Sequence, residues 1–197
     1  MTTLPFILAS SSPRRRELLA SLGIDFAICK PAIDETQHDG EAPQAYVQRL
    51  SVEKAAAVAA QTPPPVLILA ADTIVIDDGD ILGKPADAEE SRAMLRRLRG
   101  RTHRVCTAIT LAQVGQSART ITRLTCTDVT MRAYSEAEIS AYIATGDPFD
   151  KAGGYAIQHP GFAPVAQVVG SETNVVGLPL ETLREALAEI GWSQVVD

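Results

Sequence analysis

The chain has 197 residues, of which 46% are hydrophobic, and a formal net charge of −6 at pH 7. This length and apolar content allow one medium-sized domain, or two closely joined lobes, with a sizeable core. The acidic balance argues against a general nucleic-acid surface. We therefore expect no nucleic-acid partner, and basic residues that act locally on a small polyanionic ligand.

Targeting and redox signals are weak in this sequence. No basic segment precedes an apolar one near the N-terminus, and no run approaches the ~18 apolar residues of a membrane span. We therefore expect a cytoplasmic protein with no membrane partner.

Cys29, Cys106 and Cys126 are far apart and form no CxxC pattern, which argues against a disulfide framework or a structural zinc site. We expect all three to be reduced.

The first predicted elements are a strand and a helix joined by a serine turn. Phe6–Ala9 is a short apolar run of the kind found in buried strands. Ser12 is a good N-cap and Pro13 suits the first helical position, so the helix is expected to begin near Pro13. Gly23 marks its expected end.

The serine turn carries the most direct sign of chemistry. Arg14, Arg15 and Arg16 fall in the first helical turn, where the helix dipole disfavours cations by roughly 0.3 to 1 kcal/mol each. A bound anion would offset that cost. Together with serine hydroxyls and free backbone N–H groups, the arginines make a phosphate-binding pattern. A solvated basic turn is the alternative.

A buried cation is predicted in the next helix. Ala42–Ala60 has a helical apolar stripe that includes Leu50 and Val58, and Lys54 lies midway between them. An ammonium in that stripe points toward the core or a cleft and needs an anionic partner, unless it snorkels to the rim. In the polar loop before this helix, Glu35 is the candidate acidic residue.

A carboxylate interrupts the predicted central strand. Val66–Ile76 is almost continuously apolar except for Asp72. A carboxylate there is costly unless it is paired, bound to a metal or facing a cleft. The alternative is a strand-end aspartate that caps a turn. Asp77–Asp80 is expected to be a solvated hairpin turn, and the sharp turn that follows presents Lys84, which could meet the same anion as Lys54.

The rest of the chain continues an α/β pattern without repeats. Phe149–Gln158 is glycine-rich and polar, and its terminal amide is expected to face a ligand, with a plain surface glutamine as the alternative. The other expected elements are a helix from Asp87 to Leu98 with a solvated arginine face, strands Thr102–Ala112 and Arg119–Met131, a helix from Ser135 to Gly146, a turn at Asn174–Leu180 and a last helix to Ile190.

The candidate residues are carboxylates plus cations. The sequence lacks the P-loop, dinucleotide-binding and nucleophile-elbow motifs, and its histidines lack metal-ligand spacing. Asp72 and Glu35 could hold a divalent ion, while Lys54, Lys84 and the arginines neutralise phosphates. This apparatus indicates phosphate-ester or anhydride chemistry, with Mg²⁺ as the natural metal.

Several motifs follow one another along the chain: LASSSPRRREL, AADTIV, GKP, DKAGGYAIQ and NVVGLPL. In this order and at these separations they resemble the Maf family of nucleoside triphosphate pyrophosphatases. The resemblance implies a single Maf domain over 1–197, with an elongated, mixed-sheet α/β fold of the inosine triphosphatase-like type. Two closely joined lobes would surround a central cleft, commonly in a homodimer. It also implies hydrolysis of a nucleoside triphosphate to the monophosphate and pyrophosphate, with Mg²⁺ or Mn²⁺.

The resemblance also implies roles for individual residues. Asp72 matches the family's proton acceptor and, with Glu35, its metal position. Lys54 and Lys84 match catalytic and phosphate-binding positions. The remaining phosphate positions match Ser10, Ser12 and Arg15, and the positions linked to base choice match Arg14, Thr73 and Gln158.

The base-choice positions resemble the branch that acts on dTTP and UTP. The branch acting on 7-methyl-GTP typically has Trp, Gln and Glu there, and a neutral amide offers a pyrimidine edge both a donor and an acceptor. His159–Pro160 and Glu172–Thr173 depart from the family, so a related or modified pyrimidine nucleotide stays open. House-cleaning of the nucleotide pool is the expected role, and a regulator of cell division or septum formation with little turnover is the alternative.

Overall fold

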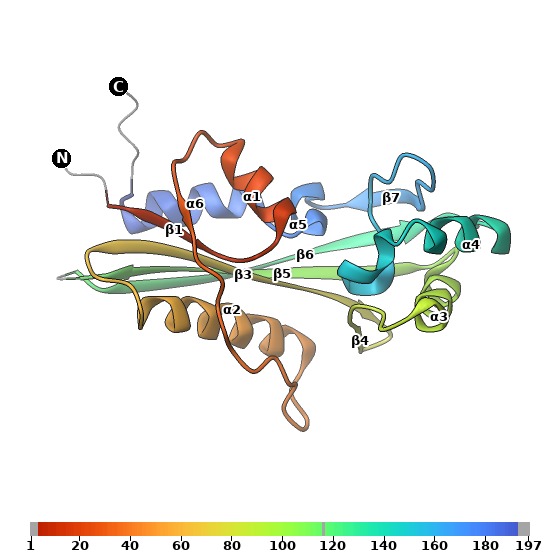
Figure 1. Ribbon diagram of the computed structural model, residues 1–197, viewed down its shortest axis with the longest axis horizontal. Helices are drawn as coiled ribbons and strands as arrows, with labels where there is room; N and C mark the ends of the chain where they lie inside the picture. Colours follow the sequence, from red (N-terminus) through yellow and green to blue (C-terminus); the bar gives the residue numbers. More distant parts are fainter. Residues whose placement is uncertain (1–3, 116, 193–197) are drawn as a thin grey trace. The chain divides into compact units, whose positions relative to one another are not determined.

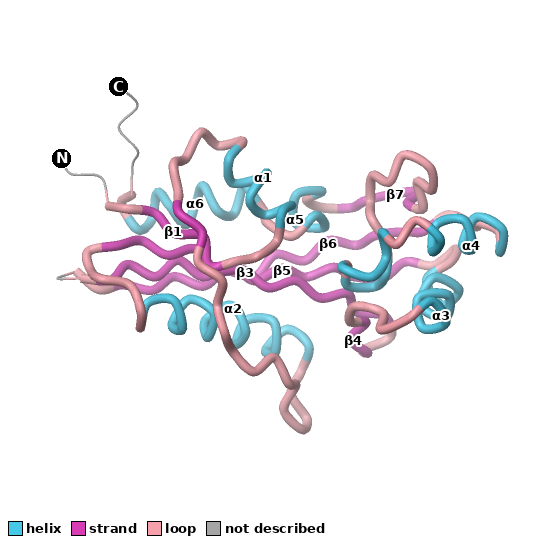
Figure 2. Tube along the Cα trace, in the orientation of Figure 1, coloured by secondary structure: helices cyan, strands magenta, loops and turns pink. Residues whose placement is uncertain are grey.

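The computed structural model describes residues 4–115 and 117–192, which form a mixed α/β structure (Figures 1 and 2). The expected mixed-sheet α/β class is confirmed. Seven strands make one sheet in the order β2-β1-β3-β5-β6-β7, with β4 paired to β3. The strands are β1 (Phe6–Ala9), β2 (Ala27–Ile28), β3 (Val66–Asp77), β4 (Asp80–Leu82), β5 (Thr102–Val114), β6 (Arg119–Met131) and β7 (Val165–Val169).

Six α-helices and two short 3₁₀ helices accompany the strands in the described residues. None of these helices combines the length and apolar character needed to cross a membrane. The helices are α1 (Pro13–Ala20), α2 (Pro43–Ala59), α3 (Ala88–Leu98), α4 (Glu136–Ala144), η1 (Asp147–Asp150), η2 (Ala152–Gly154), α5 (Glu172–Val176) and α6 (Leu180–Ile190).

The chain divides into two compact units. The first contains the described residues of 1–72, 107–125 and 177–197, and the second contains residues 73–106 and 126–176. Each unit has its own buried apolar cluster or clusters.

In the first unit, helices cover both faces of the strands. Figure 1 shows α1 and α6 on one face and α2 on the other. On β3, Leu67 and Leu69 pack in the cluster that holds the α1 and α6 residues. Ile68 and Ala70 pack in the cluster that holds the α2 residues. Because side chains alternate along a strand, the even-numbered row of β3 faces α2, and Asp72 continues that row.

The second unit packs α3 and α4 around an aromatic-rich core that includes Tyr134, Tyr142 and Phe162. The predicted helix starts are confirmed. Asp87 accepts hydrogen bonds from the first-turn N–H groups of α3. Ser135 and Glu138 form the reciprocal capping box at the start of α4.

The expectation of a solvated turn at residues 77–80 is wrong for its first residue. Asp77 is 2% exposed. Its carboxylate accepts a hydrogen bond from Arg97 Nε at 2.6 Å, and Arg101 Nη1 lies 3.4 Å away. Arg97 therefore belongs to a partly buried ion pair and is not part of a freely solvated face. Only the packing of α3 brings this arginine to the strand end.

The expectation of three reduced cysteines is also wrong. Cys106 and Cys126 form a disulfide, with Cα atoms 4.1 Å apart, and Cys29 is the free cysteine. The two partners lie twenty residues apart in sequence on β5 and β6, which are neighbours in the sheet. Strand pairing places them opposite each other, and sequence spacing alone does not reveal it.

Two further elements differ from the sequence-based expectation. A turn was expected at Asn174–Leu180. Its first three residues instead form the end of a short helix, α5, and α6 follows. Strand β7 was not predicted. It pairs antiparallel with β6, with a register irregularity at Thr130–Met131. Its sequence, VAQVV, is apolar at four of five positions, yet none of these residues is buried.

One buried histidine should make the stability of the protein depend on pH. His103 on β5 is 3% exposed, and its Nε2 lies 2.7 Å from the Tyr155 hydroxyl. Burial lowers the pKa of His103 to about 4, against the opposing charges of Asp77 and Asp128. As the pH falls from about 6.5 toward 4, the unfolded chain binds a proton that the folded chain does not bind. The free energy of unfolding therefore falls in this window.

We expect this effect to remove about 2 kcal/mol of stability at about pH 5 relative to about pH 7. His103→Gln keeps a polar partner for Tyr155 but cannot titrate, so its loss over the same interval should be smaller by that amount. Urea unfolding followed by circular dichroism at both pH values measures the difference. An identical pH dependence in both proteins would contradict the assignment.

Candidate active site

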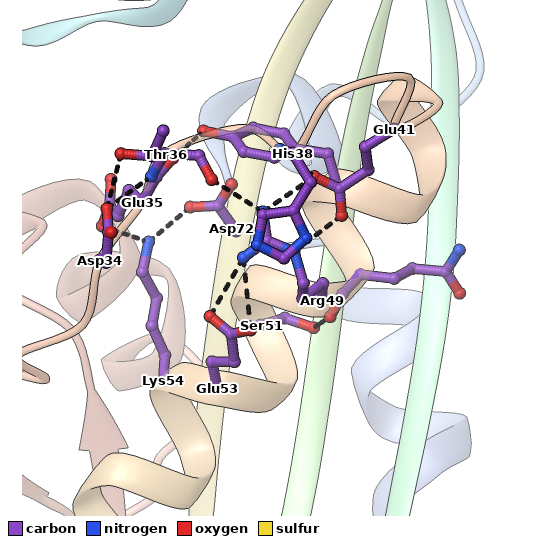
Figure 3. A network of polar contacts seen from close by, with 12 residues as sticks. Asp34, Glu35, Thr36, His38, Glu41, Arg49, Ser51, Glu53, Lys54 and Asp72 are labelled. Carbon is purple, nitrogen blue, oxygen red and sulfur yellow. Dashed lines mark hydrogen bonds and ion pairs between the residues drawn. The ribbon is translucent and has the colours of Figure 1, made fainter.

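The centre of the site is a buried ammonium between two carboxylates. Lys54 Nζ lies 2.6 Å from Asp72 Oδ1 and 2.8 Å from Glu35 Oε1 (Figure 3). The lysine side chain is 9% exposed and that of Asp72 is 12% exposed, whereas that of Glu35 is 59% exposed. One buried cation therefore joins an interior carboxylate to one that faces solvent.

Local periodicity explains why Lys54 and Asp72 meet. Lys54 lies on the buried face of α2 with Leu50 and Val58, and Asp72 continues the row of β3 that faces this helix. The predicted need for an anionic partner is confirmed, and the lysine does not snorkel to the rim. Asp72 also does not end a strand, because β3 runs on to Asp77.

Parallel strand pairing brings the serine turn to the same edge. Strand β1 pairs parallel with β3, and Ala9 lies opposite Ala70. Ser10 therefore leaves β1 next to the point where Asp72 stands on β3. The carboxyl ends of parallel strands are the usual place for a ligand in an α/β sheet.

The serine turn is ordered by its own hydrogen bonds. Ser10 is 6% exposed, and its Oγ accepts a hydrogen bond from Ser12 N at 3.1 Å. Ser12 is the N-cap of α1, and its Oγ accepts from Arg15 N at 3.4 Å. The predicted helix start is confirmed. Arg14 follows in the first turn of α1 and is partly exposed.

Arg15 is electrostatically linked to the carboxylates. Its Nε donates a hydrogen bond to Gly177 O at 2.8 Å, which fixes the side chain against the loop before α6. Burial lowers the pKa of the guanidinium, while the negative charges of Asp72 and Glu35 act in the opposite direction. The first unit thus gathers Ser10, Ser12, Arg15, Glu35, Lys54 and Asp72 in one region.

The other three predicted residues belong to the second unit. Thr73 follows Asp72 directly on β3, and its side chain is partly exposed. Lys84 and Gln158 are exposed. Their two motifs are joined within that unit, because Gly153 N donates a hydrogen bond to Gly83 O at 2.9 Å.

Gly153 shows why this joint needs a glycine. Its φ is +70°, and a Cβ placed there would lie 3.0 Å from Val75 Cγ2. Both the left-handed backbone and the close approach exclude a larger residue. The DKAGG stretch is therefore shaped to hold the turn that presents Lys84.

The two carboxylates of the site are groups that could serve as ligands of a divalent cation. Asp72 Oδ1 and Glu35 Oε1 contact Lys54 Nζ at 2.6 and 2.8 Å. The distance between these two oxygens therefore cannot exceed the sum of those two distances. Among the described residues, no group of three or more His, Cys, Asp or Glu could hold an ion. Mg²⁺ usually takes one or two carboxylates and completes its shell with water and substrate phosphates. The donor set fits that mode of binding and does not form an all-protein cage.

Comparison with known proteins identifies the family. The sequence pattern of the family described as Maf-like protein matches residues 5–190. The chain belongs to the Maf family. A dTTP/UTP pyrophosphatase of Myxococcus xanthus (strain DK1622) is 55% identical over 174 residues, which cover 88% of this chain and 86% of the relative.

Further relatives within the Maf family carry the same name. A dTTP/UTP pyrophosphatase of Escherichia coli O157:H7 is 48% identical over 181 residues, which cover 92% of this chain and 90% of that relative. Among solved structures, the nucleoside-triphosphatase (dITP/XTP pyrophosphatase) of Mycobacterium abscessus aligns over 95% of this chain and 94% of its own, with 13% identity and a TM-score of 0.43.

Sequence reasoning missed a second layer of the site. Tyr46 on α2 contacts the loop that carries Glu35. Arg49 contacts the same loop and pairs with Glu41 (Figure 3). One local signal was available, since Arg49 and Glu53 are four residues apart on a helix. Nothing in the spacing pointed to the loop.

The central ion pair predicts a stability effect. Lys54→Met would leave the Asp72 carboxylate buried without its ammonium, which we expect to lower the free energy of unfolding by about 3 kcal/mol. Adding Asp72→Asn removes the unpaired charge and should recover most of that loss. Urea unfolding at neutral pH measures both variants.

The exposed Lys30 offers a matched control, because Lys30→Met should change stability by less than about 0.5 kcal/mol. Equal losses in the single and the double variant would show that the unpaired Asp72 charge is not the cause of the destabilisation.

Proposed function

We propose that this Maf-family chain is a nucleoside triphosphate pyrophosphatase that hydrolyses dTTP and UTP to the monophosphate and pyrophosphate. The observation that carries the proposal is the buried Lys54, held between Asp72 and Glu35 beside an ordered serine turn. Relatives 46–55% identical over most of the chain carry the name of that activity. House-cleaning of the nucleotide pool is the role we assign to it.

The reaction needs a base, an entry path for water and charge neutralisation. In our proposal Asp72 accepts a proton from a water molecule whose oxygen attacks the α-phosphorus. The bond from that phosphorus to the oxygen bridging to the β-phosphate breaks, and pyrophosphate leaves with the electron pair. Lys54 orients Asp72 through the 2.6 Å hydrogen bond. A base must lie within hydrogen-bond reach of the proton that it removes.

The cations are assigned to the phosphates. Ser10, Ser12 and Arg15 would hold them at the start of α1, where the positive end of the helix dipole favours anions. Lys54 and Lys84 would neutralise the charge that develops on the leaving pyrophosphate. Phosphates bound at the start of α1 would also offset the unfavourable position of arginines in the first turn of a helix.

A divalent metal belongs to the proposal. Glu35 and Asp72 would hold Mg²⁺ or Mn²⁺ together with the phosphates of the nucleotide. When bound, such an ion neutralises phosphate charge and lowers the pKa of a coordinated water. Asp72 thus serves as base or as metal ligand, or as both at different stages.

Base choice is assigned to Arg14, Thr73 and Gln158. The exposed amide of Gln158 offers a donor and an acceptor, which suits a pyrimidine edge. His159 follows it and stacks edge-on against Tyr142, with ring centroids 4.9 Å apart. A homodimer remains a prediction from the family resemblance, and a cytoplasmic location remains a prediction from the sequence pattern.

The activity test is pyrophosphate release from a nucleotide panel. We expect turnover concentrated on dTTP and UTP over CTP, the purine triphosphates and 7-methyl-GTP, because a neutral amide fits a pyrimidine edge. A chelator should abolish turnover, and Mg²⁺ or Mn²⁺ should restore it. Binding of nucleotides without any turnover would overturn the proposal and favour a regulator of cell division.

The central carboxylate has its own test. Asp72→Asn keeps the size and a hydrogen-bond acceptor for Lys54 but removes the charge, so kcat should fall by about 10²-fold or more while the folded structure persists. Asp128→Asn is a matched control, since Asp128 is a half-exposed partner of Arg104 in the second unit. Near-normal turnover of folded Asp72→Asn would contradict the assigned role.

A further inference from the structure

The loop that carries Glu35 has no regular secondary structure of its own. Residues 29–42 contain neither helix nor strand. The Glu35 side chain is 59% exposed, yet its Oε1 lies 2.8 Å from Lys54 Nζ. An exposed glutamate on an irregular loop has many available rotamers, and fixing them costs conformational entropy. Something outside the carboxylate must therefore hold the loop in place.

Two side chains of α2 hold consecutive carbonyl groups of this loop. The Tyr46 hydroxyl donates a hydrogen bond to Glu35 O at 2.8 Å. Arg49 Nη2 donates to Thr36 O at 3.0 Å (Figure 3). Lys54 extends from the same helix. The backbone of Glu35 and the Lys54 ammonium that contacts its carboxylate are thus both held by the same helix, α2.

Arg49 is itself fixed from both sides. Its Nε and Nη2 donate to the two oxygens of Glu41 at 2.7 and 2.8 Å, and its Nη1 lies 3.2 Å from Glu53 Oε2. Glu41 also accepts a hydrogen bond from His38 N at 3.1 Å. A bidentate arginine–carboxylate pair has a defined geometry. This pair therefore closes the far end of the loop onto the helix.

The charges of the site carboxylates also act on the residues of α2 that hold the loop. Burial raises the pKa of the Tyr46 hydroxyl, and the charges of Asp72 and Glu35 raise it further. The Arg49 guanidinium holds the pKa of Glu41 at about 2. Tyr46 therefore stays a neutral donor, and the Glu41–Arg49 pair stays ionised, throughout the neutral pH range.

We propose that Tyr46 and Arg49 are positioning residues, which fix Glu35 at the distance from Lys54 and Asp72 that turnover requires. The inference rests on the proposed function, because it gives Glu35 a task in the reaction. Neither residue is assigned contact with the nucleotide. Misplacement of a reacting group by about 1 Å can cost about 10²-fold in rate, so the loop's anchor matters even though it lies behind the site.

The test is a double-mutant cycle with Glu35. Arg49→Gln removes the guanidinium, and Tyr46→Phe removes a single hydroxyl while keeping the ring. Each is measured alone and combined with Glu35→Gln, for kcat and KM on dTTP with saturating Mg²⁺. Arg96→Gln is the matched control, because Arg96 makes a comparable two-point pair with Glu136 on α3 and α4 in the second unit.

We expect kcat to fall about tenfold in Arg49→Gln and about fivefold in Tyr46→Phe, with smaller changes in KM. In the Glu35→Gln background either substitution should change kcat by less than about twofold, because the group they position is already gone. Hydrogen exchange should increase at residues 35–41 in the Arg49 variant and not in the Arg96 variant.

Several outcomes would overturn the inference. Equal losses in the presence and absence of the Glu35 carboxylate would show a general structural role. Unchanged kcat in folded Tyr46→Phe and Arg49→Gln would show that the loop needs no anchor. Full activity of Glu35→Gln would remove the task of Glu35 and this inference with it. The nucleotide panel and Asp72→Asn would still decide the proposed function independently.

Discussion

The buried ammonium of Lys54 is the constraint on which the site depends. An unpaired charge in the interior costs several kcal/mol, and the cost is offset only when partners of opposite charge lie at hydrogen-bond distance. Asp72 and Glu35 supply those partners at 2.6 and 2.8 Å. One of them comes from the central strand and the other from a loop without regular structure. The lysine therefore dictates that a strand, a helix and a loop meet at one point.

Two periodicities make this meeting possible. The period of the helix places Lys54 on the buried face of α2, and the period of the strand places Asp72 in the row of β3 that faces this helix. Parallel pairing of β1 with β3, with Ala9 opposite Ala70, then delivers the serine turn to the same edge. The phosphate-binding pattern and the acidic pair thus share a site, although Glu35 and Asp72 lie 23 and 60 residues after Ser12 in the sequence.

The site combines features that are unfavourable by themselves. Arginines lie in the first turn of α1, where the dipole opposes them, and the Glu35 carboxylate stands on a loop that needs an anchor. Both make sense if the region is organised for a polyanionic ligand carrying a divalent ion. The anchor formed by Tyr46, Arg49 and Glu41 then restricts the loop before the ligand arrives. Such preorganisation lowers the entropy that binding must offset.

Local pattern alone determined a large part of this protein. Ser12 as a helix cap, Lys54 within an apolar stripe and Asp72 within an apolar strand were visible because cap preference, helical period and strand alternation act over a few residues. Tertiary structure alone decided the Cys106–Cys126 disulfide and the hydrogen bond from Arg49 to the Glu35 loop. Those contacts depend on which strands become neighbours and on how an irregular loop folds back. No short-range periodicity encodes such arrangements, since their energies come from groups that only the completed fold brings together.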